Sequence, residues 1–162
     1  MIEIASDDPL IERIAWIHEQ IPKSYDSCYV TTELEVKLRT ESIRLLMKYN
    51  HDRIIVVEKA QLSAFIWFHI GEETHVKSLY VHPDERGKGY AYRLKQYVER
   101  LSLSAGVNYI YGHVDPDNHA MRRLNHKLGY SADGKMMYKY IDMPISTLYI
   151  DERKLGVNQE II

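Results

Sequence analysis

Three apolar runs follow one another closely in the middle of the chain, and this feature constrains the fold most strongly. They are IIVVE at 54–58, LSAFIWFHI at 62–70 and HVKSLYV at 75–81. Runs of this length that are rich in Val, Ile, Phe and Tyr are typical of strands. The polar turns between them, at 59–61 and 71–73, are too short for a parallel crossover. The sequence therefore predicts an antiparallel meander of three strands.

Four segments outside the meander repeat apolar residues at helical spacing. Each has a start or stop signal: proline at position 9 opens the first, a capping box of Thr32 and Glu35 opens the second, and Gly106 and Gly129 end the last two. The sequence therefore predicts four helices, each with an apolar stripe along one face. The stripes are Leu10, Ile14, Ile17 and Ile21; Leu34, Leu38, Leu45, Leu46 and Tyr49; Leu94, Tyr97, Val98, Leu101 and Ala105; and Met121, Leu124 and Leu128.

Further short strands complete the pattern. Ile2 and Ile4 fit a first strand, and NYIYGHV at 108–114 fits a fifth. The Asp133-Gly134 dipeptide is a hairpin turn that leads into a last strand. Strands followed by a helix, a strand, a helix and a hairpin predict a mixed α/β sheet.

Composition describes an ordinary globular chain. Of its 162 residues 45% are hydrophobic and 27% charged, with a formal net charge of -2, so there is no electrostatic reason to expect nucleic acid or a membrane as partner. Apolar stretches are far shorter than the ~20 residues of a membrane span, and the first residues do not resemble a signal peptide. We therefore expect a cytoplasmic protein with one domain, residues 1–142, and an extension of that domain, residues 143–162.

Cysteine and histidine usage argues against redox and metal chemistry. The single cysteine, Cys28, excludes an internal disulfide and a CxxC pair, and no local signature marks it as a nucleophile. The eight histidines show no H-x-x-x-H spacing and have no accompanying cysteines. The sequence therefore predicts no metal site.

Gly87 and Gly89 stand between the last strand of the meander and the third helix, in HPDERGKGYAYRL at 82–94. Free N–H groups at a helix start suit a phosphate, and glycine lets the anion approach the backbone. A Walker A loop does not fit, because Lys88 lies between the glycines and no Ser or Thr follows. A Rossmann fingerprint does not fit, because Tyr92 holds the place of the third glycine. The remaining alternative is a glycine turn that only begins a helix.

The residues around these glycines resemble a known family. LYVHPDERGKGYAYRL at 79–94 is similar to the acetyl-CoA segment of the GNAT acetyltransferases, a strand ending in V-x-P followed by R-x-x-G-x-A, carried here by Arg86, Gly89 and Ala91. NHAMRRLNHKLGY at 118–130 is similar to the N-x-x-A-x-x-L-Y-x-K-x-G-F helix of the same family. Two motifs in the right order are more specific than either one alone.

The resemblance implies a mixed, mostly antiparallel sheet of about six or seven strands flanked by four helices. The fourth and fifth strands of such a sheet splay apart, with the pantetheine arm of acetyl-CoA in the cleft and its pyrophosphate on the glycine loop. The implied cofactor-binding residues are Leu79, Tyr80 and Val81 on the strand, Arg86, Gly87, Lys88, Gly89, Tyr90 and Ala91 at the loop, and Asn118.

The resemblance also suggests where a catalytic base would stand. The family often uses a carboxylate on the fourth strand, and His75 takes its place here. An imidazole with a pKa near ~6.5 suits a base at neutral pH, although a histidine at this point can also be structural. Glu73 and His69 are the alternatives, and a backbone N–H near Val81 is the implied donor to the oxyanion.

On the acid side the chain departs from the family. Asn125 stands where the family commonly has a tyrosine next to the sulfur. An amide can donate a hydrogen bond but has no proton to release near neutral pH. Either another group supplies the proton, or the thiolate takes it from water. Tyr130 falls at a core position of the family, and Asn118 either caps its helix or contacts the cofactor.

We therefore expect an N-acetyltransferase that moves the acetyl group of acetyl-CoA directly to a primary amine of a small molecule or a protein. The alternative is an inactive GNAT-fold module that binds acyl-CoA or a partner protein, which the missing tyrosine supports. The TLYI segment at 147–150 could add a strand across a homodimer interface.

Overall fold

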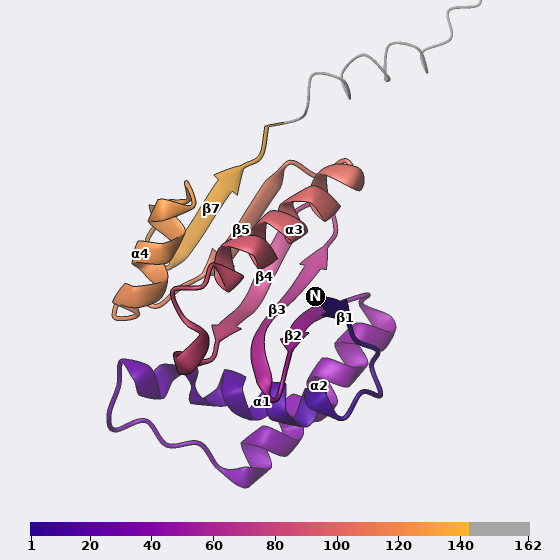
Figure 1. The fold of residues 1–162 in the computed structure, drawn as a ribbon, viewed down its shortest axis with the longest axis vertical. Helices are drawn as coiled ribbons and strands as arrows, with labels where there is room; N and C mark the ends of the chain where they lie inside the picture. The colour runs from indigo at the N-terminus through magenta and orange to yellow at the C-terminus, as the bar shows by residue number, and fades with distance from the viewer. Residues whose placement is uncertain (143–162) are drawn as a thin grey trace, which may run out of the picture.

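The structure is a computed structural model that describes residues 1–142. Its centre is a seven-stranded sheet in the order β1-β2-β3-β4-β5-β7-β6 (Figure 1). Neighbouring strands are antiparallel except β4 and β5, which run parallel. The mixed, mostly antiparallel sheet and its meander, β2 to β4, are confirmed. The strands are β1 (Ile2–Glu3), β2 (Arg53–Glu58), β3 (Leu62–Ile70), β4 (Thr74–Val81), β5 (Tyr109–His113), β6 (Ser131–Asp133) and β7 (Met136–Tyr140).

The predicted helices flank this sheet. They are α1 (Leu10–Gln20), α2 (Glu33–Tyr49), α3 (Tyr90–Ser104) and α4 (His119–Lys127), and the 3-10 helices η1 (Ile21–Ser24) and η2 (Pro83–Glu85) follow α1 and β4. The side chains of α1 and α2 pack on one face of the sheet, and those of α3 and α4 pack on the other. Figure 1 shows α3 lying along β3 to β5, with α4 beside β7.

The central strand β3 explains why its sequence is apolar without alternation. Phe65 and Trp67 belong to the core beneath α1 and α2, whereas Ile66 and Phe68 belong to the core beneath α3 and α4. A strand buried on both faces has no solvent side to fill with polar residues. The two cores together fix β3, and through it β4, in position.

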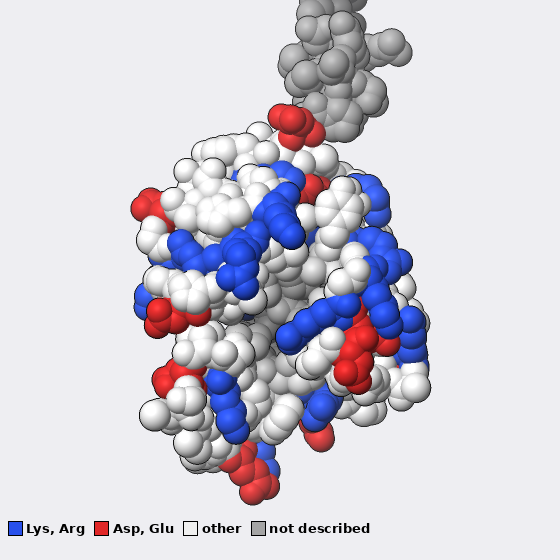
Figure 2. Space-filling view, turned by 60° about the vertical axis from the view of Figure 1, so that its left-hand side comes forward, with Lys and Arg blue, Asp and Glu red and all other residues white. Residues whose placement is uncertain are grey.

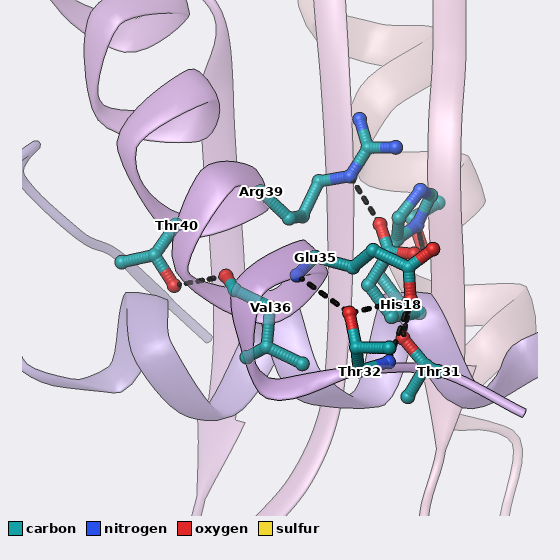
Figure 3. A network of polar contacts seen from close by, with 9 residues as sticks. His18, Thr31, Thr32, Glu35, Val36, Arg39 and Thr40 are labelled. Atoms are coloured by element: carbon teal, nitrogen blue, oxygen red, sulfur yellow. Dashed lines mark hydrogen bonds and ion pairs between the residues drawn. The ribbon is translucent and has the colours of Figure 1, made fainter.

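Helix α2 differs from its sequence pattern. Four residues of the expected stripe are exposed: Leu34 by 64%, Leu38 by 62%, Leu45 by 54% and Tyr49 by 73%. The helix instead buries Thr40 and Ile43, with Leu46 and Met47 partly covered. Its Thr32–Glu35 capping box is present as predicted (Figure 3).

Strands β4 and β5 meet over a short distance only. The paired residues are Thr74 with Ile110 and His75 with Tyr111. Just past these pairs the backbones come very close, because a Cβ built on Gly112 would lie 2.9 Å from the Val76 carbonyl oxygen. Only glycine fits this approach without a backbone shift. Beyond it β4 has no ladder with β5 among the described residues, so the predicted splay is present.

Two further expectations concern the C-terminal extension and membrane-spanning helices. The predicted extension at 143–162, including its TLYI strand, lies outside the described residues. Among the helices of residues 1–142, none combines the length and the apolar character needed to cross a membrane.

Candidate active site

The loop between β4 and α3 carries the two glycines in left-handed conformations. Gly87 has a φ of +78° and Gly89 a φ of +83°, and a Cβ at either position would meet no atom within 4 Å. Both glycines therefore face open space. Arg86 Nε donates to the Val81 carbonyl at 3.1 Å, which ties the loop to the end of β4.

The start of α3 offers free backbone donors. Within residues 1–142, the amides of Gly87, Lys88 and Gly89 donate to no other backbone group. Such amides, together with the positive end of the helix dipole, form a binding site for an anion. Lys88 Nζ lies 2.9 Å from Glu85 Oε2, and this bond lowers the pKa of Glu85. The loop therefore fits a pyrophosphate through its backbone more than through a free lysine.

A cavity of about 240 Å³ begins where β4 and β5 separate. It is lined from both faces of the sheet, since α1 and η1 contribute on one side and α3 and α4 on the other. Figure 2 shows a hollow between α4 and the segment after α1, with Lys and Arg side chains on both of its sides. The polar and charged lining residues are His18, Tyr25, Lys77, Ser78, Lys95, His113, Asp115, Asn118, Asn125 and Tyr130.

His18 enters the cavity from the α1 face. Its Nδ1 is 3.0 Å from Ser78 Oγ, and its ring meets that of Trp67 edge to face with centroids 5.3 Å apart. Burial, reinforced by the charge of Arg39, lowers the pKa of His18 to about 4. At neutral pH the imidazole is therefore uncharged and able to accept a proton.

Lys95 enters from the α3 face. It is only 4% exposed, and its Nζ donates to Asn125 Oδ1 at 2.5 Å and lies 3.9 Å from the centroid of the Tyr130 ring. Burial lowers the pKa of Lys95 to about 7. The other end of Asn125 is also engaged, since Nδ2 donates to Met137 Sδ at 3.4 Å. The Tyr130 hydroxyl is buried and has no hydrogen-bond partner within residues 1–142.

His75 lies at the seam of β4 and β5 and is not among the residues that line the cavity. Its ring stacks on Tyr111 with centroids 4.6 Å apart. Burial and the nearby charge of Lys77 lower the pKa of His75 to about 4. Its role as a base stays a prediction. Of the alternatives, Glu73 is exposed in the β3–β4 turn, and His69 Nδ1 lies 3.5 Å from Asp52 Oδ1.

Only some of the residues expected to bind the cofactor lie at the cavity. Leu79 and Asn118 line the cavity, and Asn118 Oδ1 also caps α4 by accepting from the Met121 amide at 3.3 Å. Tyr80 points to the opposite core and stacks on Phe65 at 5.7 Å. Tyr90 is buried beneath α3, so only its backbone is available to a ligand.

Sequence reasoning did not find His18, Ser78 or Lys95. For Lys95 a signal was present, because it shares the buried side of α3 with Leu94 and Val98. A lysine among such positions is unusual in a helix stripe. For His18 and Ser78 no signal was present, since their contact joins residues 60 positions apart in the sequence. Within residues 1–142, no group of three or more His, Cys, Asp or Glu could hold a metal ion.

Comparison with known proteins places the chain. The sequence profile of the acetyltransferase (GNAT) family matches residues 13–130, while a comparison with curated proteins finds no match. A structure described as a GNAT family acetyltransferase from Staphylococcus aureus is 32% identical, with a TM-score of 0.61 over 67% of this chain and 95% of that one. The PaiA N-acetyltransferase of Thermoplasma acidophilum, solved with coenzyme A, has a TM-score of 0.63 at 17% identity, over 86% of this chain and 99% of that one. The family profile and the staphylococcal relative agree, and the chain belongs to the GNAT acetyltransferase family.

Proposed function

We propose that this protein is an N-acetyltransferase that transfers an acetyl group from acetyl-CoA directly to a primary amine. The observation that carries the proposal is the cavity between β4 and β5, which begins at the Gly112 seam and is lined by His18 on one face of the sheet and by Lys95 on the other. A cavity lined from both faces can hold two reactants against each other, and positioning of this kind is worth ~7 to 11 kcal/mol.

The glycine loop supports acetyl-CoA as the acetyl donor. The free amides at 87–89 and the open space above both glycines suit a pyrophosphate. Two structures of the same fold were solved with such ligands, PaiA with coenzyme A and YncA of Salmonella typhimurium with acetyl-CoA. The YncA structure has a TM-score of 0.56 at 20% identity. When bound, acetyl-CoA supplies the activated acetyl group, and the chain supplies the groups around it.

Two histidines compete for the role of base. Both are neutral at pH 7, since burial lowers the pKa of each to about 4. His18 lines the cavity and His75 does not, so His18 is better placed to take a proton from the acceptor ammonium, directly or through water. A backbone N–H near Val81 stays the proposed donor to the oxyanion.

One observation favours the inactive alternative. The Asn125 Oδ1 accepts from Lys95 and one of the two Nδ2 protons is donated to Met137 Sδ, which leaves a single amide proton for a sulfur. A module that binds acetyl-CoA without turning it over would need none. The acceptor amine, the cytoplasmic location and a homodimer stay predictions as well.

Thermal unfolding with and without acetyl-CoA tests the first step. At a hundred times Kd the ligand should add ~2.7 kcal/mol to the free energy of unfolding. Adenosine triphosphate at the same concentration is the control for unspecific anion binding. Release of free thiol with a panel of primary amines then separates the enzyme from the inactive module. An unchanged melting temperature would contradict both versions of the proposal.

A further inference from the structure

Lys95 is a buried amine whose contacts within the described part of the chain include no carboxylate. The acid whose charge acts on it, Glu99, has its carboxylate 2.9 Å from Lys139 Nζ instead. Burying an ammonium without an anion is unfavourable, and a contact that only joined α3 to α4 would need no charge. An anion that enters the cavity would therefore stabilise the ammonium form of Lys95.

The geometry leaves one proton of Lys95 available to such a partner. An ammonium has three N–H donors. One points to Asn125 Oδ1, and the ring of Tyr130 covers a second side of the nitrogen. Because Lys95 lines the cavity, the remaining donor is the one that a ligand there would meet. The unpartnered Tyr130 hydroxyl is a second buried donor at the same place.

The position of Lys95 relative to His18 indicates which reactant it serves. Lys95 belongs to α3 and His18 to α1, so the two lie on opposite faces of the sheet and meet the cavity from opposite sides. The glycine loop that suits a pyrophosphate leads directly into α3, on the side of Lys95. Lys95 therefore lies on the same side of the cavity as the glycine loop, and His18 lies on the other side.

We propose that Lys95 is the general acid of the reaction, which donates a proton to the departing thiolate of coenzyme A, with Asn125 as its positioning residue. This inference rests on the proposed function. The amine nitrogen bonds to the acetyl carbon, and the carbon–sulfur bond breaks with its electron pair going to sulfur. One Nζ proton of Lys95 then moves to sulfur, which gives the thiol and a neutral lysine. The acceptor ammonium loses two protons in becoming an amide: one restores the Lys95 ammonium, and one goes to solvent.

The electrostatics around Lys95 agree with this role. Its pKa of about 7 is below the ~8.5 of an ordinary thiol, so transfer to the thiolate is downhill. Glu99 raises that pKa and Lys139 lowers it, and neither approaches the cavity closely enough to line it. The other titratable groups that line the cavity, besides Tyr130 in contact with Lys95, are His18, Tyr25, Lys77, His113 and Asp115.

Lys95→Met is the direct test, with single-turnover rates measured across pH on protein saturated with acetyl-CoA. The wild-type rate should fall at alkaline pH as Lys95 loses its proton. The variant should be about 10²- to 10⁴-fold slower at neutral pH, because general acid catalysis commonly contributes a factor of this size. Its rate should not fall at alkaline pH. Its affinity for acetyl-CoA should change little. Lys139→Met, which removes a partly buried lysine outside the cavity, is the matched control: it should keep the wild-type rate at neutral pH and keep the alkaline fall, moved to higher pH because Lys139 lowers the pKa of Lys95.

A second readout does not depend on turnover. The ultraviolet absorbance of the thiolate reports the apparent pKa of coenzyme A bound to the protein. That pKa should be lower in wild type than in Lys95→Met, because an ammonium stabilises a thiolate and a thioether does not. Equal values in the two proteins, or an unchanged rate profile in Lys95→Met, would overturn the role of Lys95 while leaving the proposed function intact. A wild type that does not bind acetyl-CoA would overturn both.

Asn125→Asp tests the positioning role. A carboxylate in place of the amide oxygen would raise the pKa of Lys95. The alkaline fall of the rate should therefore move to higher pH, which a purely structural role of Asn125 would not produce. A fall at the wild-type pH would exclude Asn125 from the mechanism.

Discussion

A substitution at Gly89 tests whether the glycine loop binds acetyl-CoA, because its effect on affinity can be measured apart from its effect on stability. Its φ of +83° makes Gly89→Ala strained by about 1–2 kcal/mol. Its new methyl group would stand in the open space where we place the pyrophosphate. We expect the affinity for acetyl-CoA to fall at least about tenfold, which is 1.4 kcal/mol, measured by calorimetric titration.

The matched control is Gly106→Ala at the other end of α3. Gly106 has a φ of +77° and also faces open space, so the loss of stability should be similar. Its affinity for acetyl-CoA should equal that of wild type. Similar affinities in the two variants would remove the glycine loop from the binding site.

The two neutral histidines can be told apart by substitution. Because His18 lines the cavity and His75 does not, His18→Ala should slow turnover by about 10²-fold or more, as loss of a general base does. His75→Ala should slow it by less than about tenfold and leave affinity for acetyl-CoA unchanged. The reverse order would return the role of base to His75.

For single residues, the sequence predicts contacts between neighbours in the chain but not contacts between residues far apart in the chain. Gly87, Gly89 and the Thr32 cap act within a few residues, so a motif or spacing describes them fully. The contact of His18 with Ser78 and that of Lys95 with Asn125 join different elements. Only the folded chain brings such pairs together, and no spacing in one sequence encodes them.

Helix α2 allows the observed packing to be tested against the apolar stripe expected from the sequence. Ile43 is fully buried whereas Leu38 is 62% exposed. Ile43→Ala should therefore cost about 2–5 kcal/mol of unfolding free energy, and Leu38→Ala should stay within about 0.5 kcal/mol. Urea unfolding of the two variants measures both values. A larger loss for Leu38→Ala would mean that its side chain is covered in solution.

The same helix shows why elements are easier to predict than their faces. Two stripes run along α2: one consists of Leu34, Leu38, Leu45 and Tyr49, and the other of Val36, Thr40, Ile43 and Met47, which are apolar except for Thr40. The first is richer in leucine, yet the second faces α1 and the sheet. Periodicity gives the position of a stripe on its own helix, whereas the neighbouring elements decide which stripe is covered.

For the whole molecule, the two buried histidines predict a loss of stability in acid. The pKa of His18 and of His75 is about 4 in the folded protein and near ~6.5 in the unfolded chain. Between these values the unfolded state binds more protons, so stability falls as pH falls through this window. His18 costs at most about 1.4 kcal/mol per pH unit, and the half-buried His75 costs less because solvent screens it.

Thermal melts between pH 7 and pH 4 measure this dependence. His18→Phe, which keeps an aromatic ring beside Trp67, should have a shallower decline than wild type. A control is His51→Phe, because His51 is exposed. Parallel declines in all three proteins would contradict the burial of a neutral His18.

At the seam between β4 and β5 the sheet separates the α1 side of the cavity from the α3 side. Two residue pairs and the close approach at Gly112 hold its halves together, and beyond them the cavity passes between the strands. In the proposed reaction, one reactant can therefore come from the α1 side and the other from the α3 side, and neither has to leave before the other enters. In that reaction, substitutions among the lining residues of the α1 side could then change the acceptor without altering the glycine loop on the α3 side.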